Sequence, residues 1–411
     1  MYGLGHRPHL LTVVSITESE YCRQMAHFET LAARPEEDPV EQEYAGLGPR
    51  AVEVLMQQAR RGGPEVALGR LMQGQNKSIR VLALISDDAT GRPLRAIHFD
   101  LAGAHPTSDA LDLETFAEDA GRRILTAMCA EDAKEQEILP EPLSLALWKT
   151  LSSPQAMNAA GRAFTRFGFF TDPIAIEKIL GFRGGIGEAI AAQYSEGCYA
   201  VFEPQVGGLI TTATGSSKFV DKRFISRDDQ AIVAGIKPAR DGALVRQIEG
   251  RPTVLPSVEA VEMMSICEAV AYADPATVGE ATRSSSARAI LHGHLGVSAY
   301  DPRFVEAVTL EEPFYQYLVS CGTGALAEGT SRAFARSNTL RDPADPRRVV
   351  FLEQPGHGVV IVEKRDENQP FSSIRDSLDN GLLRMSMRVP QGAIQWSPQP
   401  GPDGAPVLHK A

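Results

Sequence analysis

The chain has 411 residues, of which 43% are hydrophobic, 23% charged and 7% aromatic, and its formal net charge is −11. This length is enough for a large core and is typical of two domains. An acidic chain lacks the basic excess with which nucleic-acid-binding proteins neutralise phosphates, so we expect no nucleic-acid partner.

The sequence shows no pattern typical of a membrane-spanning helix or a signal peptide. No apolar run approaches the roughly 20 residues of a membrane-spanning helix. The start, MYGLGHRPHLLTVVSITESE, lacks the layout of a signal peptide. We therefore expect a cytoplasmic protein with no membrane partner. The five cysteines are widely spaced and form no C-x-x-C pair, which predicts neither a disulfide framework nor a structural zinc site.

The first 150 residues predict helices and one hairpin. Residues 50–61 and 109–129 have helical spacing. Two apolar runs within 78–103 flank the turn-forming segment DDATGRP, which indicates a β-hairpin. Three prolines at 140, 142 and 154 then favour a boundary near residue 150. We predict an N-terminal α+β domain over 1–150 and a C-terminal α+β domain over 151–411.

The C-terminal region predicts further helices and three hairpins. Helices are expected at 155–167 and 173–180, a glycine loop at 181–197, and a helix from Ser257 with Glu259 and Glu262 in its first turns. Antiparallel hairpins are predicted within 198–215, 230–250 and 348–364. The fold class is therefore α+β, with antiparallel sheets and packed helices. The tail, 393–411, is rich in Pro and Gly and is expected to be loose.

The segment EEPFYQYLVSCGTGALAEGTSRAF (311–334) places a cysteine between a strand-prone run and an alanine-rich helix. We predict that Cys321 stands where the free N–H groups and positive end of a helix lower a thiol's pKa and can hold an anion. Gly322, Thr323 and Gly324 would let the backbone approach a ligand closely. The alternative interpretation is a buried cysteine in a glycine turn.

This segment resembles the Cys-Gly-Thr-Gly segment of the diaminopimelate epimerase and proline racemase type of enzyme. VVFLEQPGHGVVIVEK resembles the two strands and glycine turn that follow it in diaminopimelate epimerases, so the resemblance covers about residues 310–364. It implies that Cys321 moves a proton at a substrate's α-carbon. Those enzymes have a second cysteine in a matching Cys-Gly-x-Gly segment. Here FRGGIGEA has no cysteine, and Cys198 lacks the glycines.

Basic and serine-rich segments are candidates for binding an anionic substrate. In TRSSSARAILHGHLG, Ser285 lies between Arg283 and Arg288, and Lys218 follows Gly-Ser-Ser in another segment. Arginine forks, hydroxyls and helix N–H groups all bind carboxylate or phosphate. For each segment, the alternative interpretation is an ordinary polar loop or hairpin exit.

The histidines allow two other roles. His357, in QPGHGVV, could orient or deprotonate Cys321, or it could be a solvent-exposed turn residue. A metal site using His98 and Asp100, or His292 and His294, is an alternative to satisfied or surface histidines. We predict no cofactor, with a metal ion as the alternative.

These patterns favour an enzyme acting on a small anionic metabolite. Cys321 and His357 would be catalytic, in an isomerase or lyase or in a hydrolase that forms a thioester. A metal-dependent enzyme and a non-catalytic structural or assembly protein are the alternatives. A homo-oligomer is compatible with each.

Overall fold

The structure is a computed structural model, and it describes the greater part of the chain. The described residues are 11–35, 49–76, 78, 80–100, 103–108, 114, 118, 121, 136–170, 197–213, 222, 225–273, 283–311, 322–366, 368–390 and 396–410. The predicted helix at 173–180 and glycine loop at 181–197 fall almost entirely outside them. Most of the predicted helix at 109–129 does too.

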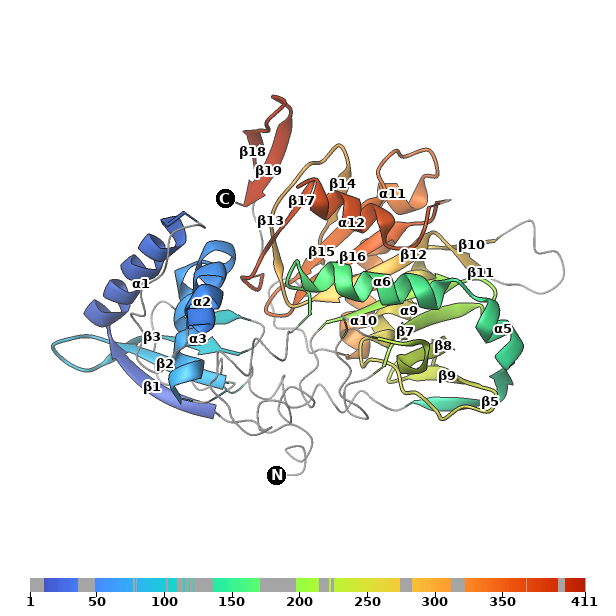
Figure 1. Ribbon diagram of the computed structural model, residues 1–411, viewed down its shortest axis with the longest axis horizontal. Coiled ribbons are helices and arrows are strands. Elements are labelled where there is room, and N and C mark those ends of the chain that lie inside the picture. The colour runs from blue at the N-terminus through green and yellow to red at the C-terminus, as the bar shows by residue number, and fades with distance from the viewer. Residues whose placement is uncertain are drawn as a thin grey trace.

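The N-terminal elements form a small sheet packed on helices (Figure 1). Its strand order is β1-β2-β3-β4, with β1 and β2 parallel and the other pairs antiparallel. The predicted helix at 50–61 and the predicted hairpin within 78–103 are both present, as α2 and as β2 with β3. The elements are β1 (Leu11–Thr17), α1 (Glu18–Ala33), α2 (Pro49–Gly62), α3 (Pro64–Asn76), β2 (Arg80–Ser86), β3 (Pro93–Phe99) and β4 (Ala104–Ser108).

Strands from the rest of the chain form a larger mixed sheet. Among the described residues its order is β14-β15-β16-β12-β6-β7-β8-β9-β5, and only the two edge pairs are parallel. The three predicted hairpins are present as β6 with β7, β8 with β9, and β15 with β16, which confirms the α+β class. The strands are β5 (Glu137–Leu143), β6 (Cys198–Glu203), β7 (Gly208–Thr212), β8 (Gln230–Ile236), β9 (Ala243–Ile248), β12 (Ala287–Gly293), β14 (Val305–Val308), β15 (Val349–Gln354) and β16 (Gly358–Lys364).

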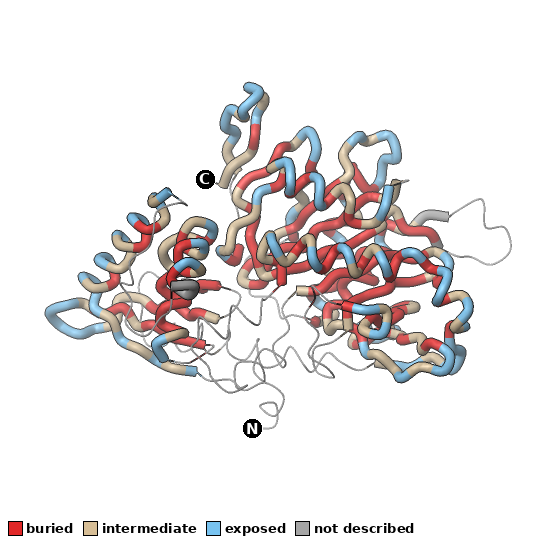
Figure 2. Tube along the Cα trace, in the orientation of Figure 1, coloured by how far each residue is buried: buried red, intermediate tan, exposed pale blue. Residues whose placement is uncertain are grey.

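Helices cover both faces of this sheet, so central strands such as β6 and β16 are buried throughout, whereas the edge strand β5 is largely exposed (Figure 2). Alternate residues of a strand point to opposite faces. On β6, Tyr199 and Val201 therefore join one core while Ala200 and Phe202 join the other. One core includes α5 (Leu145–Thr150), α6 (Ser153–Thr165) and α12 (Ser372–Asp379). The other includes α9 (Ala260–Ala269), α10 (Gly324–Ala335) and α11 (Asn338–Arg341).

Two smaller sheets complete the described fold. β10 (Ala271–Ala273) pairs with β11 (Arg283–Ser285). A four-stranded sheet has the order β17-β13-β19-β18, from β13 (Gly296–Tyr300), β17 (Leu383–Ser386), β18 (Trp396–Pro400) and β19 (Pro406–Lys410). The expectation of a loose tail is wrong for 396–410. The hairpin of β18 and β19 is stabilised by pairing with β13 and by Trp396, which packs against Tyr300 and Phe351.

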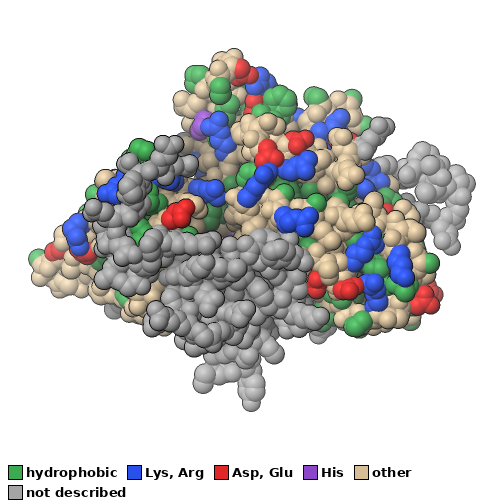
Figure 3. Space-filling view, in the orientation of Figure 1, with side chains coloured by type: hydrophobic (Ala, Val, Ile, Leu, Met, Phe, Trp, Pro, Cys, Tyr) green, Lys and Arg blue, Asp and Glu red, His purple; other side chains and the backbone are tan. Residues whose placement is uncertain are grey.

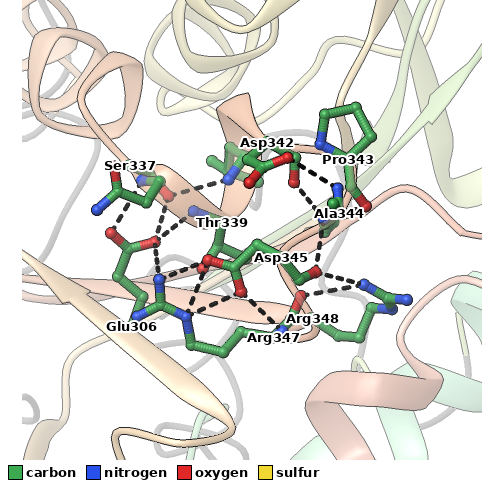
Figure 4. A network of polar contacts seen from close by, with 12 residues as sticks. Glu306, Ser337, Thr339, Asp342, Pro343, Ala344, Asp345, Arg347 and Arg348 are labelled. Carbon is green, nitrogen blue, oxygen red and sulfur yellow. Dashed lines mark hydrogen bonds and ion pairs between the residues drawn. The ribbon is translucent and has the colours of Figure 1, made fainter.

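A polar network holds α11 against the edge of the large sheet (Figure 4). The carboxylate of Glu306, on β14, accepts hydrogen bonds from Ser337 Oγ and the backbone N–H groups of Asn338 and Thr339. It thus caps the N-terminus of the short helix. The ammonium group of Lys364 donates to the carbonyls of residues 342, 343 and 345 beyond the other end of the helix.

The two-domain division at residue 150 remains a prediction. β5 precedes residue 150, yet it pairs with β9 of the large sheet.

On the face seen in Figure 3, basic and acidic side chains are interspersed. Among the described helices, none has the length and apolar content that crossing a bilayer requires.

Candidate metal centre

Four potential metal ligands converge where several elements of the large sheet end. Glu259 immediately precedes α9, His292 lies near the end of β12, and His294 follows that strand. His357 lies in the turn between β15 and β16. Because β12 pairs with β16, with His292 opposite Val360, the turn carrying His357 meets the end of β12.

The ligand atoms of these four residues all lie within 4.8 Å of one another. Nε2 of His292 and Nε2 of His357 lie 3.1 and 3.3 Å from the same oxygen, Oε1 of Glu259. The ring centroids of the three histidines are 4.7 to 5.3 Å apart. A divalent ion bound by nitrogen and oxygen atoms at about 2 Å requires this kind of convergence.

The hydrogen bonds of the site leave ring nitrogens available to a metal. Nδ1 of His292 lies 3.1 Å from the carbonyl oxygen of Val359. Its N–H donates there, which leaves the lone pair of Nε2 facing the cluster. Nε2 of His292 and Nε2 of His357 both face Oε1 of Glu259, at the distances given above. Nδ1 of His357 is buried and has no hydrogen-bond partner among the described residues. Buried polar atoms are rarely left without a partner.

The electrostatics of the site suit a cation. Burial opposes ionisation of Glu259, but His292 and His357 hold the pKa of that carboxyl well below its usual range. Burial, together with the neighbouring His292 and His294, lowers the pKa of His357 to about 4, although Glu259 opposes this. At neutral pH the site therefore contains a carboxylate and a neutral imidazole of His357, which are the forms that bind metals. The four side chains could hold a first-row divalent ion such as Zn²⁺.

Close backbone packing brings the His357 turn against β12. A Cβ added to Gly358 would lie 2.2 Å from the carbonyl oxygen of Gly293 and 2.9 Å from Cα of His294. Only glycine permits this approach without a shift of the backbone. Gly358 is thus part of the reason that His357 reaches the other ligands.

A second set of buried polar side chains surrounds the ligands. The thiol of Cys198, the first residue of β6, donates to Oε2 of Glu259 over 2.7 Å. Burial and the Glu259 carboxylate raise the pKa of this thiol well above its usual value. One turn further along α9, Glu262 accepts from Gln354. Burial and then the Glu259 charge raise the pKa of Glu262 to about 8.

Several site residues predicted from the sequence have structural hydrogen-bond partners or lie outside the described residues. Cys321, Lys218 and the side chain of Arg283 lie outside the described residues. The hydroxyl of Ser285 donates to the carbonyl of Cys267, and Arg288 donates to the carbonyl of Phe202. These two side chains have structural partners, and their predicted role in anion binding remains untested.

The helix predicted after the cysteine is present as α10. Thr323 is its N-cap and accepts from the backbone N–H of Leu326, and Gly324 is its first residue. Gly322 has a φ of +70° and packs against Val258, which precedes Glu259. The N-terminus of α10 therefore lies beside the start of α9 and close to the metal ligands.

The other predicted metal pair lies elsewhere. His98 belongs to the N-terminal sheet, and Asp100 follows β3 and contacts Nε2 of His105 at 3.1 Å and Nη1 of Arg80 at 3.8 Å. Within the described part of the chain, His98 and Asp100 belong to no group of three or more converging metal ligands.

The structure thus combines His292 and His294 with His357, which the sequence analysis assigned to a different site. The alternative of a solvent-exposed His357 is wrong, because the residue is 8% exposed. Sequence reasoning missed Glu259 and Cys198. For Glu259, the sequence shows a carboxylate at the predicted start of a helix. A favourable interaction with the helix dipole also explains a carboxylate there, so this pattern does not identify a metal ligand.

Comparisons with known proteins add little to this geometry. No family model matches the chain, and no curated protein matches it. One solved structure that shows some likeness is that of L-fuculose 1-phosphate aldolase, at 14% identity and a TM-score of 0.28, over 53% of this chain and 77% of that chain. At this TM-score the likeness carries no argument about fold or activity. The resemblance to diaminopimelate epimerases and proline racemases remains a prediction.

Proposed function

We propose that the protein is a metal-dependent enzyme whose centre consists of Glu259, His292, His294 and His357. The observation that carries this proposal is the convergence of one buried carboxylate and three imidazoles, whose ligand atoms all lie within 4.8 Å of one another. This residue set and spacing are typical of a site for a divalent metal ion.

We further propose that the reaction removes or adds a proton on a small anionic substrate, as in a lyase or isomerase. A bound divalent ion would act as a Lewis acid on a carbonyl or hydroxyl oxygen of the substrate. Glu259 is ionised and buried among the ligands, so it would supply negative charge to the bound ion. His292 and His357 flank this carboxylate and restrict its orientation.

Support for an anionic substrate comes from Lys222. This side chain is 8% exposed, and its Nζ lies 5.5 Å from the centre of the Phe170 ring. Its charge lies close enough to Cys198 to oppose the rise in that thiol's pKa. A buried ammonium group near Cys198 would attract a carboxylate or phosphate.

The test begins with metal content. Protein purified without added metal would be analysed by mass spectrometry for bound ions, as the wild type and as the double variant His292→Ala/His294→Ala. We expect near-stoichiometric divalent metal in the wild type and loss of most of it in the variant. His409→Ala, on β19 and outside the group of converging ligands, is the matched histidine control and should retain the metal.

The reaction class would then be tested with a panel of small hydroxy- and keto-acids and sugar phosphates, monitoring deuterium incorporation from D₂O. We expect exchange that requires metal, and we expect Glu259→Gln to lose this exchange together with most of the bound metal, because Glu259 is a ligand. Wild-type protein that binds no divalent ion, even after incubation with Zn²⁺ or Mn²⁺, would contradict the proposed centre.

A further inference from the structure

The two oxygens of Glu259 have different partners. Oε1 lies near Nε2 of His292 and of His357. Oε2 accepts the hydrogen bond from the Cys198 thiol over 2.7 Å. One oxygen therefore faces the potential metal ligands, while the other is held by a side chain from a different strand.

Strand pairing fixes the thiol in this position. Cys198 lies directly opposite His292 in the antiparallel pair of β6 and β12, so the two side chains are on the same face of the sheet. Both residues are 1% exposed. The thiol is not a member of the group whose ligand atoms lie within 4.8 Å of one another, so its contact is with the carboxylate and not with the shared position of the ligands.

We propose that Cys198 is a positioning residue for the metal centre, which holds Glu259 so that only Oε1 is directed at the ion. This inference depends on the proposed metal centre. The physical reason is that a hydrogen bond to one carboxylate oxygen restricts rotation of the group and disfavours coordination through both oxygens. Hydrogen bonds from the protein to metal ligands typically change metal affinity by 10–100-fold when they are removed.

The experiment measures Co²⁺ affinity and the Co²⁺ absorption spectrum of the metal-depleted full-length protein. The variants are Cys198→Ala, which removes the donor, and Cys198→Ser, which keeps a donor. Cys267→Ala is the matched control, because Cys267 is equally buried on α9 and belongs to the same apolar core. Thermal unfolding of all variants would be measured without metal.

We expect Cys198→Ala to weaken Co²⁺ binding by about 10-fold or more and to weaken the visible absorption bands, because a second carboxylate oxygen raises the coordination number. Cys198→Ser should restore most of the affinity, and Cys267→Ala should bind like the wild type. A merely structural role would lower the melting temperature of both alanine variants without separating their affinities.

Three results would overturn the inference. Equal Co²⁺ affinity in Cys198→Ala and Cys267→Ala would show that the thiol does not position the carboxylate, with the metal centre itself intact. A sulfur-to-cobalt charge-transfer band that disappears in Cys198→Ser would show that Cys198 is itself a ligand. Absence of Co²⁺ binding by the wild type would remove the proposed function together with the inference.

Discussion

At the scale of single residues, the protonation of buried side chains decides what the centre can bind. Glu259 and Glu262 are three residues apart at the start of α9 and both are buried, yet their pKa values move in opposite directions. Histidines face Glu259 and favour its charged form. Among the described residues, Glu262 has the neutral hydrogen-bond partners Gln354 and Thr330, and the charge of Glu259 opposes its ionisation. The interior thus holds one carboxylate and one neutral acid side by side.

The raised pKa of Glu262 predicts a pH dependence of stability in the metal-free protein. Between about 4.5, its ordinary value, and about 8, the native state retains a proton that the unfolded state has lost. The contribution of Glu262 to the free energy of unfolding is complete below pH 4.5 and is lost as the pH rises through 8. In the wild type, Glu262 should therefore lower the free energy of unfolding by about 1.4 kcal/mol per pH unit in this range, and Glu262→Gln should remove this pH dependence.

Urea unfolding at pH 5, 6, 7 and 8, with a chelator present, would measure this difference. Glu328→Gln is the control, because Glu328 is exposed on α10 and pairs with Arg332. Identical pH profiles for wild type and Glu262→Gln would show that Glu262 is ionised in the native state at neutral pH.

The predicted thiolate of Cys321 is testable by the pH dependence of iodoacetamide labelling. We expect Cys321 to label with a midpoint below the roughly 8.5 of an ordinary thiol. Cys198 and Cys267 should label slowly, because they are buried and burial raises the pKa of Cys267 to about 12. Peptide mass spectrometry would resolve each cysteine, with exposed Cys22 as the internal reference. Labelling of Cys321 as slowly as Cys198 would make it a core residue.

At the scale of elements, the centre depends on three segments of the chain that meet at the end of β12. The turn between β15 and β16, the start of α9 and the end of β12 each contribute ligands. Their approach is governed by backbone packing, because the carbonyl of Gly293 lies where a side chain at 358 would begin. A change at this contact should therefore affect the metal before it affects the whole fold.

Gly358→Ala is expected to move the His357 turn away from β12. Because the added Cβ would lie 2.2 Å from a backbone oxygen, we predict at least a 10-fold loss of Co²⁺ affinity and a destabilisation of about 1–3 kcal/mol. Isothermal titration and urea unfolding would measure the two effects. Gly235→Ala, in β8 of the same sheet, meets only an ordinary contact of 3.4 Å and is the control. Equal affinities would show that the turn tolerates the shift.

At the scale of the whole molecule, the large sheet joins segments that are far apart in the sequence. Its edge strand β5 comes from 137–143, before the predicted boundary, and Leu143 belongs to the same core as Trp148 and Phe371. A boundary placed at 150 separates β5 from β9, its partner. If independent domains exist, the geometry favours a boundary N-terminal to β5.

This can be tested with two fragments, 136–411 and 151–411. We expect the longer fragment to unfold cooperatively and to bind Co²⁺, whereas the shorter one should be less stable by several kcal/mol, because it exposes the edge of β9 and loses Leu143. Circular dichroism during urea unfolding would compare them. Equal stability of the two fragments would support the boundary at 150, and failure of both to fold would show that the N-terminal elements are required.

The sequence by itself determined the local elements. Alternating or continuous apolar runs that flank glycine turns identified the hairpins at 198–215, 230–250 and 348–364, because strand period and turn chemistry are encoded within a few residues. For the same reason Thr323 could be predicted near the start of a helix. The Pro- and Gly-rich composition of 396–410 predicts a loose tail, but pairing with the distant strand β13 stabilises a hairpin there.

Only the tertiary structure decided the site. His292 and His357 are 65 positions apart in the sequence, and Glu259 comes from a third segment. Their convergence follows from the pairing of β12 with β16 and from the packing of α9 on the sheet. Cys198 reaches Glu259 only because β6 pairs with β12. No local pattern records these long-range contacts, so a carboxylate that caps a helix and one that could bind a metal look the same in the sequence.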